Sequence, residues 1–383
     1  MRSTADVVVI GGGIVGCSVA YHLAAAGAGA VLLLERADAV GTGSTGACAG
    51  GFRHQFSSEV NIRLSLVSVP MIVRFSEEHD LPLDVAQDGY LFLVRDRQTW
   101  ESFAAAAELQ RALGVDARLM SPSEAAEVSP GISLEGLVGA TFCPDDGIAD
   151  PAGLTQGYAT VARRVGAELE LGIEVERVVV DRGRVTGVET SGGPVAAPVV
   201  VDAAGPWAGI VAASAGVDLP LEPIPRIIVT TGPFPGTPSR RTLVVDAETG
   251  FYFHQEADGV LMGMGGPDAR PSFSTDVDER FVVEELLPTA VRVFPPVERA
   301  GLRATWCGLY EMTPDRHPIV GGSPLPGLFL ANGFSGHGFQ HAPIAGKLLA
   351  ELIVDGAAAS VDISALSFER FAEGNVVIEG HVV

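Results

Sequence analysis

The chain has 383 residues, which is long enough for two domains and a sizeable core. Its formal net charge is −22, from 47 acidic side chains against 25 lysines and arginines. A charge of this sign argues against nucleic acid or an anionic membrane surface as a partner. Lys347 is the single lysine, so no other residue can supply lysine chemistry.

The cysteines and the apolar N-terminal stretch indicate whether the protein binds metal or crosses a membrane, and where it is located. Cys17, Cys48, Cys143 and Cys307 show neither C-x-x-C spacing nor a zinc-ligand pattern, so we predict no metal site. Residues 7–34 carry no Asp, Glu, Lys or Arg and have the length of a membrane span. Glycines interrupt that run, so we expect no span, and without a signal peptide we expect a soluble protein of the reducing cytoplasm.

The first 35 residues follow the pattern of a dinucleotide-binding strand–helix–strand unit. The run Val7-Val8-Val9-Ile10 predicts a strand buried on both faces, and residues 31–34 predict a second strand. A helix is expected between them, over residues 14–25. The glycines between the first strand and this helix have the spacing G-x-G-x-x-G: Gly11, Gly13 and Gly16.

Each glycine has a physical role in this unit. Gly11 permits the tight turn, Gly13 lets the backbone approach a pyrophosphate, and Gly16 lets helix and strand pack closely. Glu35 ends the second strand, near the usual spacing for an acid that hydrogen-bonds ribose hydroxyls. A glycine-rich turn without a ligand is the less favoured alternative. Neighbouring residues expected to contact the cofactor are Ile14, Val15 and Arg36.

Further along, the hydrophobic pattern predicts helices and strands in two groups. Helices are expected over residues 62–79, 99–113, 151–165 and 276–286, with Asp150 as N-cap of the third. Strands are expected over residues 89–94, 168–180, 184–190, 195–201, 227–231, 242–246, 250–254 and 259–263. The concentration of strands in residues 216–305 indicates an antiparallel sheet that covers the cofactor domain.

A second glycine-rich turn lies near the other end of the chain. Residues 333–340 join a buried strand at 328–331 to a helix expected over 342–354. A helix N-terminus there can stabilise negative charge on a ring system, which a reduced flavin carries and a nicotinamide does not. We therefore favour FAD over NAD, although an ordinary turn with a buried histidine remains an alternative.

Five motifs in chain order resemble the D-amino-acid oxidase superfamily, and within it the branch of sarcosine oxidase, dimethylglycine dehydrogenase and glycine oxidase. They are the fingerprint with Glu35, Ser44-Thr45-Gly46, Ala203 to Trp207, Gly308 to Asp315, and Gly333 to Pro343. The resemblance implies an α/β fold, with a discontinuous Rossmann-type FAD-binding domain and an antiparallel-sheet substrate domain of α+β type. It also implies that the flavin oxidises the C–N bond of an amino acid.

The predicted domain boundaries follow from this organisation. The FAD-binding domain is expected over residues 1–85, 146–215 and 306–383, and the substrate domain over 86–145 and 216–305. Cofactor contacts predicted beyond the fingerprint are Ser44, Thr45, Gly50, Gly51, Val175, Ala204, Gly205, Trp207, Gly308, Gly336, His337, Gly338, Phe339 and Gln340.

A substrate carboxylate is best held by a bidentate arginine. Arg53 is the first candidate, because the family places an arginine in the loop after the fingerprint; a surface arginine is the alternative. Arg226 is the second candidate. Tyr310 matches a family tyrosine near flavin and substrate, or is an ordinary core tyrosine. Tyr252 and His254 share one face of an expected strand, towards either the cavity or solvent.

Three positions depart from the sarcosine oxidase pattern. Gly308 replaces the cysteine that tethers FAD in monomeric sarcosine oxidases, so we predict that FAD is bound non-covalently. Gln340 replaces a lysine that helps to hold the substrate carboxylate. Leu261 lies near the position of an oxygen-activating lysine, and Lys347 is too far along its helix to substitute.

These departures favour a dehydrogenase that passes electrons to an acceptor other than oxygen. The expected substrate is a small or N-substituted amino acid, such as an N-alkylglycine or a proline-like secondary amine. An oxygen-using oxidase, a flavin subunit of a hetero-oligomeric dehydrogenase and an NAD-dependent dehydrogenase remain alternatives. The sequence identifies neither the exact substrate nor the oligomeric state.

Overall fold

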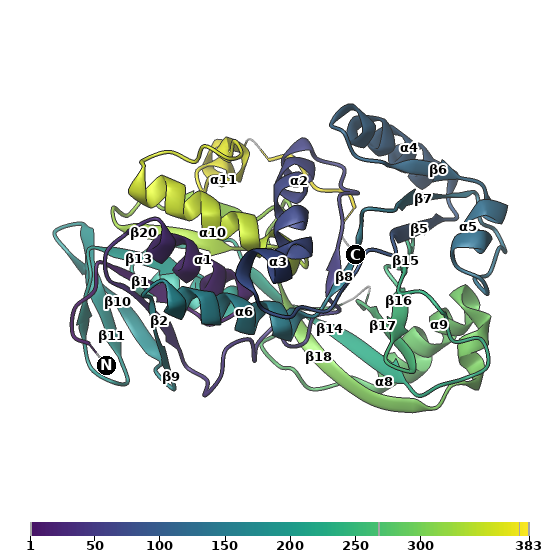
Figure 1. Ribbon diagram of the computed structural model, residues 1–383, viewed down its shortest axis with the longest axis horizontal. Coiled ribbons are helices and arrows are strands. Elements are labelled where there is room, and N and C mark those ends of the chain that lie inside the picture. Colours follow the sequence, from purple (N-terminus) through teal and green to yellow (C-terminus); the bar gives the residue numbers. More distant parts are fainter. Residues whose placement is uncertain (1, 267–268, 375, 382–383) are drawn as a thin grey trace.

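The computed structural model describes residues 2–266, 269–374 and 376–381 of the chain. These residues form a six-stranded sheet and an eight-stranded sheet towards opposite ends of the long axis (Figure 1). Two three-stranded sheets accompany them, one packed on the six-stranded sheet and one between the larger sheets.

The six-stranded sheet has the order β19-β20-β13-β1-β2-β9, and only its β19–β20 pair is antiparallel. Its strands come from three distant stretches of the chain. They are β1 (Val7–Ile10), β2 (Val31–Glu35), β9 (Glu168–Leu171), β13 (Val199–Asp202), β19 (Ile319–Gly322) and β20 (Leu328–Asn332). This arrangement confirms the predicted discontinuous Rossmann-type fold.

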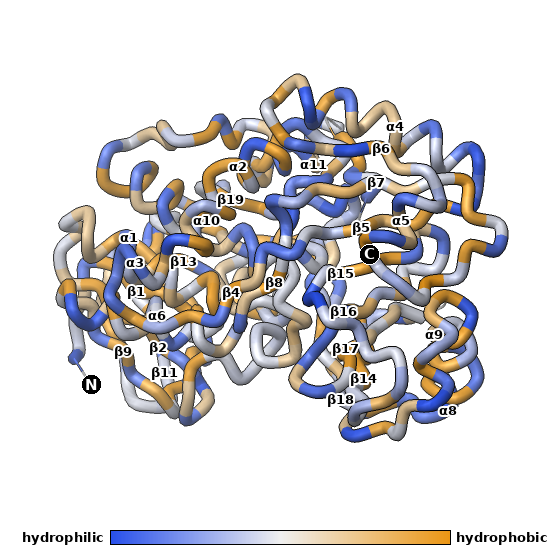
Figure 2. Tube along the Cα trace, turned by 45° about the vertical axis from the view of Figure 1, so that its right-hand side comes forward, coloured by the Kyte–Doolittle hydropathy of each residue, from blue (hydrophilic) through white to orange (hydrophobic). Residues whose placement is uncertain are grey.

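Apolar side chains cover both faces of this sheet, as its uninterrupted β-branched runs predict. Val7 and Val9 face one cluster, and Val8 and Ile10 face another. The first face packs against α1 (Ile14–Ala25), α2 (Glu59–Val73), α3 (Phe75–His79), α6 (Pro151–Arg164) and α10 (Gly338–Val354). The second packs against α7 (Ala208–Ser214) and the small sheet of β10 (Val175–Asp181), β11 (Arg184–Thr190) and β12 (Val195–Ala196). Figure 2 shows hydrophobic colours along these central strands.

The eight-stranded sheet has the order β18-β14-β17-β16-β15-β5-β7-β6 and is antiparallel except for the β5–β15 pair. Its strands are β5 (Tyr90–Val94), β6 (Arg118–Met120), β7 (Gly139–Cys143), β14 (Glu222–Thr231), β15 (Leu243–Asp246), β16 (Tyr252–Glu256), β17 (Gly259–Met264) and β18 (Leu302–Met312). The helices around this sheet are α4 (Arg97–Ala112), which packs on one face, and α5 (Pro122–Val128), α8 (Glu279–Phe281) and α9 (Leu287–Val293), which pack on the other. The α+β character expected for this part is therefore confirmed.

The remaining elements are short. A small sheet joins β3 (Gly51–Phe52), β8 (Gly147–Ala149) and β4 (Val85–Ala86), and α11 (Arg370–Glu373) lies near the C-terminus. Single 3₁₀ turns occupy residues 205–207, 295–299 and 364–366. No helix of the described part of the chain is both long and apolar enough to cross a membrane.

Several predicted elements have different limits in the structure. The strands expected over 168–180 and 195–201 are each divided between two sheets, because Gly172 turns the chain at a φ of +71° and Pro198 interrupts the second run. The helix expected over 276–286 begins at Glu279 and continues to Val293 through a π turn, since Pro288 is tolerated in the first turn of α9. The last long helix begins at Gly338, four residues earlier than expected.

The predicted division into domains remains a prediction. β18 spans the expected boundary between residues 305 and 306, and it pairs with β14 along nearly its whole length. One continuous strand therefore connects the part of the chain expected to bind substrate with the part expected to bind FAD.

The contact between α1 and α10 requires a glycine. A Cβ atom on Gly346 would lie 2.3 Å from Ser18 Oγ and 2.7 Å from the Ser18 carbonyl carbon. We expect Gly346→Ala to lower the free energy of unfolding by about 1–3 kcal/mol through overpacking, as measured by urea denaturation. Gly209→Ala is the matched control, because no atom lies within 4 Å of its Cβ position. Equal stability of the two variants would contradict this explanation.

Candidate active site

A cavity of about 1240 Å³ lies where the two large sheets meet. It is larger than the range of about 300–1,000 Å³ that accommodates drug-sized ligands, so it has room for a dinucleotide together with a small substrate. Most of the residues predicted to contact cofactor or substrate line it. Gly16, Gly50 and His254 do not.

At the end of the cavity next to the fingerprint glycines, the backbone makes close contacts. Gly11 has a φ of +106°, and a Cβ on it would lie 2.4 Å from the Ala203 carbonyl oxygen. A Cβ on Gly16 would lie 1.9 Å from the Gly11 carbonyl oxygen, so Gly16 serves packing without lining the cavity. These contacts explain why the turn accepts only glycine at both positions.

Glu35 is held by the same turn. Its Oε2 accepts a hydrogen bond from the Gly12 N–H at 2.6 Å, and its Oε1 accepts one from the Ala37 N–H at 2.8 Å. A Cβ on Gly12 would lie 2.8 Å from Glu35 Cβ, so Gly12 is a required glycine that the sequence analysis missed. A carboxylate oxygen has two lone pairs, and each therefore keeps capacity to accept from a ribose hydroxyl.

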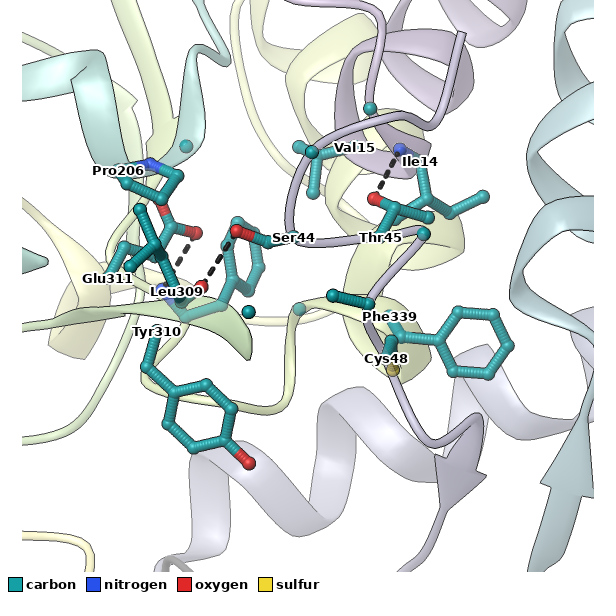
Figure 3. Close-up of a pocket in the computed structure, with 18 of the residues that line it drawn as sticks. Ile14, Val15, Ser44, Thr45, Cys48, Pro206, Leu309, Tyr310, Glu311 and Phe339 are labelled. Atoms are coloured by element: carbon teal, nitrogen blue, oxygen red, sulfur yellow. Dashed lines mark hydrogen bonds between the residues drawn. The ribbon is translucent and has the colours of Figure 1, made fainter. Parts of the chain in front are cut away.

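The loop after β2 connects the turn to the eight-stranded sheet. Thr45 Oγ1 accepts a hydrogen bond from the Ile14 N–H at 3.2 Å, at the start of α1. Ser44 Oγ donates to the Leu309 carbonyl oxygen on β18 at 2.7 Å. Figure 3 shows both contacts across the cavity wall. Ser44, predicted only as a cofactor contact, thus also links the loop to the eight-stranded sheet, and Thr45 holds the same loop on α1.

Glycines also make room at the opposite end of the cavity. A Cβ on Gly336 would lie 2.3 Å from the Tyr310 ring, and a Cβ on Gly308 would lie 2.8 Å from Ala47 Cβ. A cysteine side chain at position 308 would therefore require Ala47 to shift. His337, at the N-terminus of α10, has no hydrogen-bond partner for either ring nitrogen among the described residues. Burial lowers its pKa to about 3, so the ring is neutral.

Two carboxyl groups lie close to this end with raised pKa values. Burial raises the pKa of Asp202 to about 8 and that of Glu311 to about 7. Glu311 Oε1 accepts from the Phe334 N–H at 3.3 Å, while its Oε2 is buried without a partner in the described structure. Both groups carry a proton for part of the time near neutral pH and can then donate hydrogen bonds. Unpaired polar atoms and glycine-lined walls fit a flavin ring with its own donors and acceptors.

Arg53 is buried, with 5% of its surface exposed, and is held through its main chain by Gln340. Its N–H donates to Gln340 Oε1 at 2.9 Å, and its carbonyl accepts from Gln340 Nε2 at 3.2 Å. The guanidinium donates to the carbonyls of Gln55 and His381 and lies 4.0 Å from the Phe56 ring centre. Gln340, a candidate contact of both substrate and cofactor, lines the cavity and also positions the main chain of Arg53.

Asp146 holds the residues that follow Arg53. Its fully buried carboxylate accepts from the His54 N–H at 2.8 Å and from Gln55 Nε2 at 3.0 Å, and it lies 2.7 Å from the His54 ring nitrogen. Cys143 is close enough for the three side chains to resemble a metal site. Ligands of one ion held by bonds of about 2.0–2.3 Å stand about 3.3 Å or more apart, so the 2.7 Å contact indicates a hydrogen bond and not a metal site.

Hydrogen bonds to Glu379 hold the C-terminal segment against the start of α2. Its carboxylate is fully buried and accepts from the N–H groups of Ser57 at 2.8 Å and Ser58 at 3.1 Å, and from Asn61 Nδ2 at 3.1 Å. A carboxylate at a helix N-terminus is further stabilised by the helix dipole. His381, two residues on, stacks on Phe103 with ring centres 3.8 Å apart. The sequence offered no signal for this contact.

Three tyrosines line the cavity near Arg53: Tyr90, Tyr252 and Tyr310. Burial raises the pKa of each, so all three stay protonated and act as hydrogen-bond donors, not as bases. Tyr90 was missed in the sequence because it reads as an ordinary strand residue. Trp306 was also missed, although it shares the strand face of Gly308 and Tyr310.

His254 does not share the position of Tyr252. It is buried, and its ring nitrogens lie 3.1 Å from the Ala49 carbonyl and 2.8 Å from the Gln255 carbonyl. Burial lowers its pKa, and a neutral imidazole has one N–H, so it donates to one of these carbonyls at a time. Its place in the structure supports the loop behind the cavity wall.

The contacts of Glu379 predict a pH-dependent stability. Burial raises its pKa, but hydrogen bonds from Ser57 and Ser58 outweigh burial and hold the pKa well below its usual range. A lowered pKa stabilises the fold above the unfolded-state value of about 4.5, and this stabilisation is lost as the pH falls. We expect Glu379→Gln to lower the free energy of unfolding by about 1–3 kcal/mol at pH 7, and by progressively less below about pH 5.

Urea denaturation across this pH range measures the effect. Glu127→Gln is the control, because Glu127 is exposed on α5. If the free energies of unfolding of the wild-type protein and Glu379→Gln differ by the same amount from pH 7 to pH 3, the ionised carboxylate is not the source of the difference.

Comparison with known proteins identifies the family. Residues 6–352 match the family described as FAD dependent oxidoreductase (DAO). The mitochondrial sarcosine dehydrogenase of Homo sapiens is 33% identical over 373 residues, which cover 93% of this chain and 40% of that protein. Our chain thus spans less than half the length of that relative.

Two crystal structures are similar over nearly their whole length. L-proline dehydrogenase from P. horikoshii superposes with a TM-score of 0.91 at 32% identity, covering 98% of this chain and 99% of that one. Glycine oxidase from Geobacillus kaustophilus gives a TM-score of 0.85 at 26% identity, covering 96% and 99%. The chain belongs to the DAO family of FAD-dependent oxidoreductases.

Proposed function

We propose that the chain oxidises the C–N bond of a small or N-substituted amino acid, with the electrons passing to an acceptor other than oxygen. The observation that carries this proposal is Arg53, a buried guanidinium that lines the cofactor cavity without an ion-pair partner among the described residues. An unpaired buried charge is costly, and a substrate carboxylate would neutralise it. The names of the relatives, two amino-acid dehydrogenases and an amino-acid oxidase, support the same substrate class.

The residues around the cavity are suited to binding and orientation more than to acid–base chemistry. When FAD is bound, its flavin supplies the acceptor for a hydride from the carbon next to nitrogen, and water then hydrolyses the imine. Tyr252 and Tyr310 stay protonated and so would not remove a proton from the substrate amine, which would react in its neutral form. Arg53 would fix the carboxylate and thereby place the C–H bond.

Glu35, the fingerprint glycines and the N-terminus of α1 would hold the adenosine diphosphate part of FAD. The N-terminus of α10, with His337 and Gly338, would face the ring system. We further propose that FAD is bound non-covalently, because Gly308 carries no thiol and leaves only 2.8 Å between a Cβ and Ala47 Cβ. Cys307, one residue earlier, borders the cavity but belongs to the apolar cluster of the eight-stranded sheet, and strand alternation turns it to the other face of β18 from Gly308.

The choice of a dehydrogenase over an oxidase rests on missing lysines. Leu261 is a buried strand residue, and Lys347 pairs with Glu351 on α10 without lining the cavity. An oxygen-using oxidase of the glycine oxidase kind is the second candidate. A flavin subunit of a larger dehydrogenase is the third, since the sarcosine dehydrogenase relative is more than twice as long. A cytoplasmic location remains a prediction.

The central test is reduction of the bound flavin. We expect sarcosine-like or proline-like secondary amino acids to bleach the visible flavin absorbance of the purified holoprotein under anaerobic conditions. Prompt peroxide formation in air without an added acceptor would indicate an oxygen-using oxidase. If no amine bleaches the flavin of the isolated chain, the chain is better explained as the flavin subunit of a larger dehydrogenase.

The role of Arg53 is tested by substitution. We expect Arg53→Gln to raise KM, or the Kd for flavin reduction, by about 10- to 150-fold, because a charged hydrogen bond contributes about 1.5–3 kcal/mol. Arg97→Gln is the control, since Arg97 is exposed on α4. An unchanged KM in Arg53→Gln would show that another group binds the substrate carboxylate.

Non-covalent binding of FAD is tested by acid precipitation. We expect the flavin of the purified holoprotein to remain in the supernatant after denaturation in trichloroacetic acid. Flavin that stays with the protein pellet and migrates with the chain in a denaturing gel would overturn this proposal and point to a linkage elsewhere in the cavity.

A further inference from the structure

Arg226 is a second guanidinium that lines the same cavity without an ion-pair partner among the described residues. Its Nη1 donates to the Pro225 carbonyl at 3.1 Å, while its Nε is buried and has no hydrogen-bond partner in the described structure. A Cβ on Gly265 would lie 2.6 Å from this Nε, so a glycine there makes room for the side chain. Two arginines in one cavity, neither paired with a carboxylate of the described residues, need an explanation in a chain with net charge −22.

The two arginines stand at different ends of the group of tyrosines. The Arg226 guanidinium carbon lies 4.9 Å from the Tyr310 ring centre, and that of Arg53 lies 5.9 Å from the Tyr90 ring centre. Burial raises the pKa of Tyr310, and the charges of both arginines oppose this shift. Arg53 alone acts on the pKa of Tyr90 in this way, and Arg226 alone on that of Tyr252. The ring contacts therefore place Arg226 beside Tyr310 and Arg53 beside Tyr90, at different tyrosines of the group.

Arg226 also borders a smaller pocket of about 210 Å³. Residues 247–250 and the glycines 265 and 266 form the rest of its wall. Glu248 is among them, but it is exposed, its Oε1 accepts from the backbone N–H groups of Arg95 and Asp96, and it forms no ion pair with Arg226. A group bound to Arg226 therefore has space beyond it, and no carboxylate of the described residues forms an ion pair with the guanidinium.

We propose that the substrate carries two carboxylates, one held by Arg53 and the other by Arg226, with the reacting C–N bond between them beside Tyr310. This inference rests on the proposed function and narrows its substrate class to secondary amines with two acidic groups, such as N-(carboxyalkyl) amino acids. Each substrate carboxylate can accept two parallel hydrogen bonds from the planar guanidinium of one arginine. A substrate with one carboxylate would leave the partly buried Arg226, with its buried Nε, without an anion.

The proposed reaction balances with FAD and water as co-reactants. The substrate carbon loses a hydride to the flavin and the nitrogen loses a proton, which leaves a C=N bond. Water adds to this carbon, the C–N bond breaks, and a primary amine and an oxo acid are released. A separate acceptor then takes the two electrons from the flavin.

The first test compares iminodiacetate, which has two carboxylates, with sarcosine, which has one. In anaerobic flavin reduction of the holoprotein, we expect iminodiacetate to give a ratio of reduction rate to Kd at least about tenfold higher, as expected for an added charged hydrogen bond. Arg226→Leu should reduce this preference to near one, Arg226→Lys should keep part of it, and the exposed-site control Arg97→Leu should keep all of it.

A second readout is independent of turnover. Glutarate and butyrate, which cannot be oxidised at a C–N bond, are titrated against the visible spectrum of the bound flavin. We expect glutarate to bind at least about tenfold more tightly in the wild-type protein and no more tightly in Arg226→Leu.

The two readouts separate failure of this inference from failure of the proposed function. Equal reduction by sarcosine and iminodiacetate, with equal binding of glutarate and butyrate, overturns the two-carboxylate substrate and leaves the proposed function intact. No reduction by either amine, with glutarate still preferred through Arg226, overturns the proposed function and supports the two-anion site. Glutarate preference that survives Arg226→Leu overturns the role of Arg226.

Discussion

The stretch of residues 42–58 is the constraint on which the cavity depends. It lies between β2 and α2 and contains β3, and distant parts of the chain hold it at successive points. Ser44 donates to β18, Thr45 accepts from α1, and the Ala47 carbonyl accepts from the Trp306 indole at 3.3 Å. These contacts hold the loop against both α1 and the eight-stranded sheet and thereby fix one wall of the cavity.

The second half of the same stretch is held by buried polar groups. Gln340 bonds the Arg53 main chain, Asp146 accepts from His54 and Gln55, and Glu379 accepts from Ser57 and Ser58. Such groups are costly to bury unless every donor and acceptor is satisfied, but when satisfied they specify one geometry. Their combined effect is to present the Arg53 side chain at a fixed place on the cavity wall. Rigid support of this kind is what binding and orientation of a substrate require.

The parts of the site formed by neighbouring residues could be predicted from the sequence. The glycine turn, Glu35 and the helix that follows lie within 35 residues, so spacing alone determined their relation. The turn at Gly336 and His337 was predicted in the same way. Contacts between distant residues were not readable: Glu379 lies 322 positions from Ser57, and Tyr90 has no spacing that distinguishes it from a core strand residue. His254 was expected in the site but lies behind the cavity wall, whereas Gln340 lines the cavity and also supports Arg53.

By itself, therefore, the sequence determined the cofactor-binding unit, the α/β class and the candidate arginines, because these depend on short-range periodicity and on residue chemistry. Only the tertiary structure decided which side chains share the cavity and which merely support it. That decision depends on how strands from three separate stretches pair in one sheet, and on β18 joining β14 across the expected domain boundary. Arg53 and Arg226 are 173 positions apart, and their common cavity follows from that packing, which no local pattern records.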